Sequence, residues 1–211
     1  MAQIAICGNF KVNKRKVEDN MLNETIENWY LLNIPTKPNL SQVKDLNWMQ
    51  YNPRKPIARK GFPLTSLDGG TSGIPELDSL REYNKIHGTN YKESSFQKTT
   101  SAGREIFGDF LSEFKCGRSN LIKIEPGGFF PWHRDLGEDT FRVCYFFESV
   151  NPFSFVWIEN DQVIPIHPTS WMGVNTKTKH CVFAFEPVVL AVFNILNTEE
   201  NKKNLYKYLA V

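Results

Sequence analysis

Hydrophobic and polar positions divide the chain into two parts with different periods. Up to about residue 118, apolar side chains recur at helical spacing in three segments, which loops rich in proline and glycine separate. From residue 120 the apolar runs become short and are separated by turn signals such as Gly-Gly, Asn-Pro and Glu-Pro. The pattern therefore predicts a mainly β fold with flanking helices.

Three segments of the first part carry an amphipathic helical pattern. Residues 17–32 place their apolar side chains close to helical spacing, and prolines follow them. Residues 76–86 follow a proline suited to a first helical turn and end before a glycine. Residues 102–114 carry a stripe of Ile, Leu and Phe, which predicts a helix packed against a sheet. The segment 59–74 holds four glycines and is predicted to be a loop.

Strand-like runs with no helix between them make up most of the second part. They cover residues 120–125, 141–148, 153–158, 163–167, 171–175, 180–185 and 188–196. Short strands joined by tight turns predict an antiparallel sandwich or barrel, and the double-stranded β-helix, or jelly roll, is the version that encloses a small-molecule site. We therefore expect a cupin-like jelly-roll core over residues 119–211. Residues 1–118 are expected to be a helical and loop elaboration that packs on it within one domain.

Composition and charge narrow the classes of function. The 211 residues are 41% hydrophobic and 13% aromatic, which is typical of a globular chain. A net charge of +2 gives no support for a nucleic-acid partner. No apolar run is long enough to span a bilayer, and the N-terminus lacks a signal-peptide pattern, so a cytoplasmic protein without membrane association is predicted. Four scattered cysteines without a CxxC pair indicate free thiols and give no structural zinc site.

Three residues carry the candidate chemistry. His133 and Asp135 follow an extended run and the turn Glu-Pro-Gly-Gly, so a strand there would present both side chains to one face. His180 stands at the start of a later strand-like run. Two imidazoles and one carboxylate leave one face of an octahedron open, which suits non-haem Fe(II). The alternative is structural, with His133 hydrogen-bonded to Asp135 and His180 as an interior histidine.

Residues 124–135, which read Ile-Glu-Pro-Gly-Gly-Phe-Phe-Pro-Trp-His-Arg-Asp, resemble a family motif together with Arg142 and His180. Over about residues 119–195 the chain resembles the Fe(II)/2-oxoglutarate-dependent dioxygenases, most closely the aspartyl/asparaginyl β-hydroxylase-like branch. The resemblance implies that His133, Asp135 and His180 hold Fe(II), with 2-oxoglutarate and O2 as cosubstrates. It also implies that Arg142 binds a carboxylate of 2-oxoglutarate. Because Asp135 is retained, the resemblance implies hydroxylation, of a peptide side chain or an amino acid, and not halogenation.

The chain departs from this family where a second cation is expected. Many members carry an arginine or lysine shortly beyond the distal histidine, but residues 188–192 are all apolar here. Arg142 is then the best candidate to pair with the carboxylate, and Lys123 is the second. Arg142 has a structural alternative as a surface residue paired with Glu138 or Asp139. Two other functions stay open: a non-enzymatic jelly-roll binding module, and a cosubstrate-free metal enzyme of the cupin type.

Overall fold

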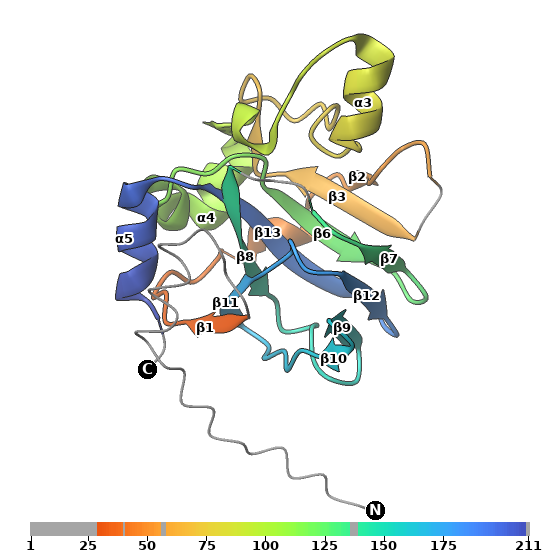
Figure 1. The fold of residues 1–211 in the computed structure, drawn as a ribbon, viewed down its shortest axis with the longest axis vertical. Coiled ribbons are helices and arrows are strands. Elements are labelled where there is room, and N and C mark those ends of the chain that lie inside the picture. Colours follow the sequence, from red (N-terminus) through yellow and green to blue (C-terminus); the bar gives the residue numbers. More distant parts are fainter. Residues whose placement is uncertain (1–28, 40, 56–57, 136–138, 210–211) are drawn as a thin grey trace, which may run out of the picture.

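Two facing antiparallel sheets form the body of the protein, as the computed structural model shows for residues 29–39, 41–55, 58–135 and 139–209 (Figure 1). Within these residues the major sheet has, in spatial order, β1 (Tyr30–Leu32), β11 (Ser170–Val174), β8 (Thr140–Phe146), β13 (Val188–Leu196), β6 (Asn120–Ile124), β3 (Arg59–Pro63) and β2 (Met49–Gln50). The minor sheet has β10 (Gln162–Val163), β9 (Phe155–Glu159), β12 (His180–Ala184) and β7 (Phe129–His133). A separate ribbon pairs β4 (Thr65–Ser66) with β5 (Lys98–Thr99).

The chain crosses between the two sheets at nearly every turn from β6 onward. β6, β8, β11 and β13 belong to the major sheet, while β7, β9, β10 and β12 belong to the minor sheet, and the pairs within each sheet are antiparallel. This alternation defines a double-stranded β-helix. The predicted jelly-roll fold class is therefore confirmed.

Strand β13 is apolar on both faces because each face is covered by a different core. Its even-numbered residues Val188, Leu190 and Val192 point between the two sheets, where they join a core of aliphatic and aromatic side chains. Its odd-numbered residues Ala191, Phe193 and Ile195 point to the other side, where they join a second, aromatic core. A strand that is covered on both faces reads as a continuous apolar run.

Helices cover the outer face of the major sheet and one end of the molecule. They are α2 (Ser41–Lys44), α3 (Leu80–His87), α4 (Ser101–Glu113) and α5 (Glu199–Lys207), with a 3-10 turn η1 (Glu93–Ser95). Helix α4 begins at its cap Thr100, whose side chain accepts a hydrogen bond from the Gly103 amide, and it buries Ile106, Phe107 and Phe110. Figure 1 shows α3 at the end of the molecule opposite β9 and β10.

Several sequence-based expectations for the elements are corrected by the structure. The helix predicted over 17–32 is wrong for its last three residues, because Tyr30–Leu32 form strand β1 and pair with β11. Residues 17–28 lie outside the described residues. Helix α3 begins at Leu80 and not at residue 76, since a turn precedes it. The predicted loop 59–74 contains β3 and β4.

Tertiary contacts account for strand β3, which local propensity did not indicate. β3 pairs with β6 along its whole length despite Gly61 and Pro63. A Cβ atom at Gly61 would lie 2.7 Å from Leu77 and 2.9 Å from Tyr51, so the glycine allows a close approach. The strands β1, β2 and β3 thus extend the major sheet from the N-terminal side, whereas the domain division at residue 118 stays a prediction.

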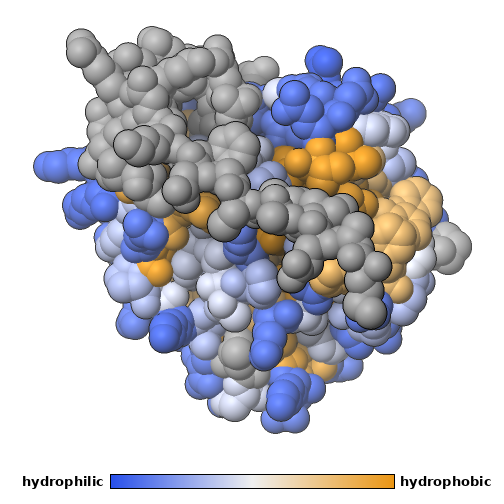
Figure 2. Space-filling model, turned by 90° about the horizontal axis from the view of Figure 1, so that it is seen from below, coloured by the Kyte–Doolittle hydropathy of each residue, from blue (hydrophilic) through white to orange (hydrophobic). Residues whose placement is uncertain are grey.

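Exposed apolar side chains lie mainly on the minor sheet and its turns. Phe129, Trp132, Phe153 and Phe185 are all more than two fifths exposed. Figure 2 shows that hydrophobic and hydrophilic side chains share the face seen from below. Among the described residues, no helix is long and apolar enough to cross a membrane.

Candidate metal centre

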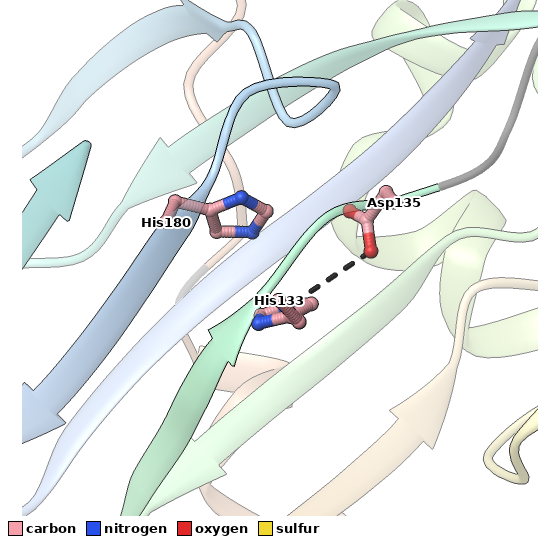
Figure 3. A group of neighbouring side chains, drawn as sticks. All are labelled: His133, Asp135 and His180. Atoms are coloured by element: carbon pink, nitrogen blue, oxygen red, sulfur yellow. Dashed lines mark ion pairs between the residues drawn. The ribbon is translucent and has the colours of Figure 1, made fainter. Parts of the chain in front are cut away.

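His133, Asp135 and His180 lie together between the two sheets (Figure 3). His133 ends β7, Asp135 follows it by two residues, and His180 begins β12 directly opposite His133 in the register. One possible ligand atom from each residue lies within 4.8 Å of the others. The structure therefore brings together the three residues that the sequence selected, and their role as ligands stays a prediction.

Backbone carbonyl groups hold both imidazole rings in one orientation. Nδ1 of His133 lies 2.6 Å from the Pro131 carbonyl oxygen, and Nδ1 of His180 lies 3.0 Å from that of Thr178. A carbonyl oxygen only accepts hydrogen bonds, so each Nδ1 carries a proton, and in the neutral form of each ring the lone pair then lies on Nε2. Each ring in its neutral form therefore offers Nε2 as a metal ligand.

The Asp135 carboxylate divides its two oxygens between two neighbours. Oδ1 lies 3.7 Å from Nε2 of His133, and Oδ2 lies 2.9 Å from Nη2 of Arg142. The Asp135 amide also donates a hydrogen bond to the Thr176 carbonyl oxygen at 2.8 Å. Oδ1 therefore faces the histidines while Arg142 holds the other oxygen, which fixes the orientation of the carboxylate.

Electrostatics favours the protonation states that a metal requires. Burial alone would raise the pKa of Asp135, but the charge of Arg142 and the two nearby histidines hold this pKa below its ordinary value. Burial lowers the pKa of His180, and the neighbouring His133 adds to this effect. Asp135 is thus ionised and His180 neutral at neutral pH, as ligands of a divalent cation must be.

The donor set fits non-haem iron. Two imidazole nitrogens and one carboxylate oxygen, with the remaining sides open to a cavity, form the arrangement that non-haem Fe(II) oxygenases use. Ring packing also holds the two imidazoles in place. Trp157 stacks on His180 with ring centroids 5.6 Å apart, and Phe130 stacks on His133 with ring centroids 6.1 Å apart. Such packing restricts the rings further.

A cavity with ≈ 670 Å³ of empty space, its open mouth included, lies beside the three residues. Its wall on the major sheet is apolar and includes Ile122, Ile124, Leu190 and Val192. The other end of the cavity lies where β6 begins and β13 ends. This end is polar, since it is lined by Arg118, Asn120, Arg142 and Asn194. The cavity thus has a polar end and an apolar wall beside the metal site.

Arg142 points into this cavity and is not a surface residue paired with Asp139. It lies on the inner face of β8, opposite Asn194 of β13 and Val174 of β11. Its Nη2 binds Asp135, but its Nε is buried and has no hydrogen-bond partner among the described residues. Asp135 raises the pKa of Arg142 against the lowering effect of burial, so the guanidinium stays charged. A charged donor without a partner beside the metal site suits a carboxylate ligand.

Lys123, the second candidate for the carboxylate, is not brought to the site. Its neighbours Ile122 and Ile124 line the cavity, so the alternation of β6 directs Lys123 to the opposite face. There its Nζ lies 3.0 Å from Oε1 of Glu125. The inward positions of β13 carry Leu190, Val192 and Asn194, and none of them is a cation.

Several polar lining residues were missed by the sequence analysis, among them Arg118, Asn120, Thr176 and Asn194. Arg118 precedes β6, and Asn194 interrupts the apolar run of β13. An asparagine within a run of apolar residues is a signal that could have been noticed, since a buried amide requires partners. Nothing in the residues around Arg118 marks it as a residue of the cavity. The indole Nε1 of Trp157, another lining residue, is buried without a partner among the described residues.

Comparison with known proteins adds little to this geometry. No protein-family model matches the chain, and no curated protein matches it. A 2OG-Fe(II) oxygenase-family oxidoreductase from Burkholderia pseudomallei is similar at 12% identity, over 75% of this chain and 76% of that one, with a TM-score of 0.42. A cupin superfamily protein from Desulfitobacterium hafniense is similar at 11% identity, over 37% and 66%, with a TM-score of 0.31.

A conserved protein of unknown function from Streptococcus pyogenes is also similar, at 7% identity and a TM-score of 0.31. The match covers 38% of this chain and 64% of that protein, so the chain spans slightly less than two thirds of its length. At these identities the similarities concern the fold alone. The strand order of the two sheets, and not the neighbours, establishes the jelly roll.

Proposed function

We propose that the protein is an Fe(II)/2-oxoglutarate-dependent dioxygenase that hydroxylates its substrate. The observation that carries the proposal is the convergence of ligand atoms of His133, Asp135 and His180 within 4.8 Å, with Nδ1 of both histidines held by backbone carbonyl oxygens. The unpartnered Nε of Arg142 in the same cavity supports a carboxylate-bearing cosubstrate. These features occur together at the place where a jelly roll holds small molecules.

Each residue has a distinct role in this proposal. Nε2 of His133, Nε2 of His180 and Oδ1 of Asp135 would hold the iron. Arg142 orients Asp135 through Oδ2 and presents its remaining donors to a carboxylate of 2-oxoglutarate. The apolar wall of Ile122, Leu190 and Val192 keeps water from the far side of the bound acid.

The bound iron would supply activation of O2, coupled to conversion of 2-oxoglutarate into succinate and carbon dioxide and to hydroxylation of a C–H bond. A peptide side chain or an amino acid is the proposed substrate, on the strength of the sequence resemblance. The cytoplasmic location predicted from the sequence belongs to this proposal, because reducing compartments keep thiols such as Cys116 and Cys144 free.

Formation of succinate tests the proposal directly. The Fe(II)-loaded protein is expected to convert 2-oxoglutarate into succinate, and His133→Ala and Asp135→Ala are expected to abolish this while the circular dichroism spectrum stays unchanged. An unchanged succinate yield in either variant would contradict the proposed dioxygenase function. Lys123→Ala is the matched control, since Lys123 lies outside the cavity, and its yield should equal that of the wild type.

One observation favours a second candidate, a cosubstrate-free metal enzyme of the cupin type. The inward face of β13 carries no cation to pair with the far carboxylate of 2-oxoglutarate. Anaerobic addition of 2-oxoglutarate to the Fe(II) protein separates the two, because bidentate chelation gives a weak visible charge-transfer band. Iron bound without a band would favour the cosubstrate-free enzyme, and no specific binding of Fe(II) would favour a non-enzymatic module.

A further inference from the structure

Arg118 is a second arginine at the polar end of the cavity, and neighbouring groups hold it firmly in place. Its Nε and Nη2 lie 2.8 and 2.7 Å from the two carboxylate oxygens of Glu93. Nη1 donates to the carbonyl oxygens of Asp78 at 2.7 Å and, more weakly, of Glu76 at 3.5 Å. A guanidinium carries five N–H groups, so one N–H on Nη2 keeps no protein partner within the described chain.

Asn194 joins this pair to the metal site. Its Nδ2 donates to Oε2 of Glu93 and to the Arg118 carbonyl oxygen, both at 2.7 Å. In the register of β8 and β13, Asn194 lies directly opposite Arg142. The two arginines therefore line the same end of the cavity, where Nε of Arg142 has no hydrogen-bond partner among the described residues.

The charges at this end of the cavity match a dianion once a divalent metal is bound. Arg118 is neutralised by Glu93, and Arg142 is neutralised by Asp135. A divalent cation held by neutral imidazoles leaves two positive charges without counter-charge at this partly exposed site. Negative charge on a ligand offsets them, so a ligand with two negative charges is favoured over one with a single charge.

We propose that Arg118, together with Arg142, binds the far carboxylate of a dicarboxylic 2-oxo acid and thereby selects it over monocarboxylic 2-oxo acids. This inference rests on the function proposed above. It replaces the cation that β13 lacks with one that comes from the segment before β6. The methylene groups of such an acid match the apolar wall of Ile122 and Leu190. The Oδ1 of Asn120, buried without a partner among the described residues, can accept a bridging water.

Selectivity between two acids in binding, without turnover, tests the role of Arg118. Calorimetry under anaerobic conditions on the Fe(II)-loaded full chain would give the Kd of 2-oxoglutarate and of 2-oxobutyrate, which lacks the far carboxylate. The wild type is expected to bind 2-oxoglutarate about tenfold more tightly or better, since charge-assisted pairs are the strong ones. The double variant Arg118→Gln/Glu93→Gln removes the cation with its counter-charge, so neither is left unpaired.

In the double variant, 2-oxoglutarate binding is expected to weaken about tenfold or more while 2-oxobutyrate binding stays unchanged. Equal weakening for both acids would overturn the role of Arg118 in selectivity. If the double variant does not fold, Arg118→Lys tests the inference, because it keeps the positive charge and loses the planar guanidinium group. Its selectivity is expected to fall, and an unchanged ratio would overturn the inference. Lys123→Gln, on the opposite face of β6, is the matched control and should keep the wild-type ratio.

Results for the wild type distinguish failure of this inference from failure of the proposed function. Equal binding of the two acids would overturn the selectivity of Arg118 and leave 2-oxoglutarate use intact. Binding of neither acid to the Fe(II) protein would overturn the proposed function and this inference with it.

Discussion

The two faces of the major sheet are built by the same strands but differ in how completely they are packed. On the outer face, helix α4 and the sheet enclose a dense aromatic cluster. The ring centroid of Phe110 lies 4.4 Å from that of Trp171, on which it stacks, and 4.5 Å from that of Phe193. On the inner face, aliphatic and aromatic side chains border an open cavity, and several polar atoms have no partner among the described residues. The outer face thus supplies stability, while the inner face leaves room and free donors for chemistry.

Along β13, odd-numbered residues face the outer side and even-numbered residues face the cavity. Phe193 packs among aromatic rings, whereas Asn194 beside it lies at the polar end of the cavity. A strand alternates its side chains between the faces, so one residue of displacement would exchange the two environments. Substitutions on the two faces should therefore have separable effects on stability and on binding.

The largest expected effect is a loss of stability on the outer face. Phe110→Ala removes a fully buried ring between Trp171 and Phe193 and is expected to lower the free energy of unfolding by about 3–5 kcal/mol. Leu190→Ala borders the cavity and should cost about 2 kcal/mol, near the low end for such changes. Urea unfolding measures both, and the exposed Phe185→Ala is the control, with about 0.5 kcal/mol or less. Equal losses for Phe110 and Leu190 would contradict the comparison.

A substitution on the inner face should instead act mainly on metal binding. Arg142→Gln removes the group that orients Asp135 and is expected to weaken Fe(II) binding about 10- to 100-fold, as loss of such supporting partners commonly does. Anaerobic metal titration measures this. Lys60→Gln is the control, since Lys60 pairs across from Lys123 on the face away from the cavity. An unchanged affinity in Arg142→Gln would show that Arg142 does not orient the carboxylate.

The sequence predicted the parts of the molecule that depend on local pattern. The short apolar runs predicted most of the core strands but not β7, and His133 and Asp135 were selected because a strand there would present both to one face. Helix α5 escaped detection, since its polar sequence carries no apolar stripe and it buries few apolar side chains beyond Leu205. Arg118 was missed for a different reason: its partners Glu93 and Asn194 lie 25 and 76 residues away, so its place in the cavity depends on the tertiary fold.

A smaller effect on the inner face is a dependence of stability on pH. The pKa of His180 is lowered from 6.5 by burial first, and that of Asp135 is held below 3.8 by Arg142 and the histidines against burial. In both cases the unfolded chain binds the proton more readily, so stability is fully present above the unfolded pKa and is lost as pH falls below it. Unfolding free energies of the metal-free protein should fall from about pH 6.5 downward, with a second loss below about pH 4.

His180→Gln should remove the first of these two losses and keep the second. Chemical denaturation over a series of pH values measures the difference between the variant and the wild type. A first loss that persists in His180→Gln would assign it to another group. Because the affected side chains border an open cavity, both losses should be smaller than the cost of Phe110→Ala.

The smallest expected effect concerns Arg59, a buried cation on the inner side of β3. It lies opposite Ile124 in the register and is 4% exposed, and its guanidinium carbon lies 3.6 Å from the centroid of the Phe130 ring. Its Nε has no hydrogen-bond partner, and none of the carboxylates in the described chain pairs with it. The contact with Phe130 offsets only part of the cost of burying the charge, which lowers the pKa of Arg59.

Arg59→Met keeps the apolar contact with Phe130 and removes the buried charge. The free energy of unfolding is expected to stay the same or to rise by about 1 kcal/mol, since replacing a poorly compensated buried charge with a hydrophobic side chain is commonly neutral or stabilising. Urea midpoints at constant m-value measure this change. A loss of about 2 kcal/mol or more would show that the guanidinium stabilises the fold. The inner face would then resemble the outer one at this edge of the sheet, and the contrast between the two faces would hold only around the cavity.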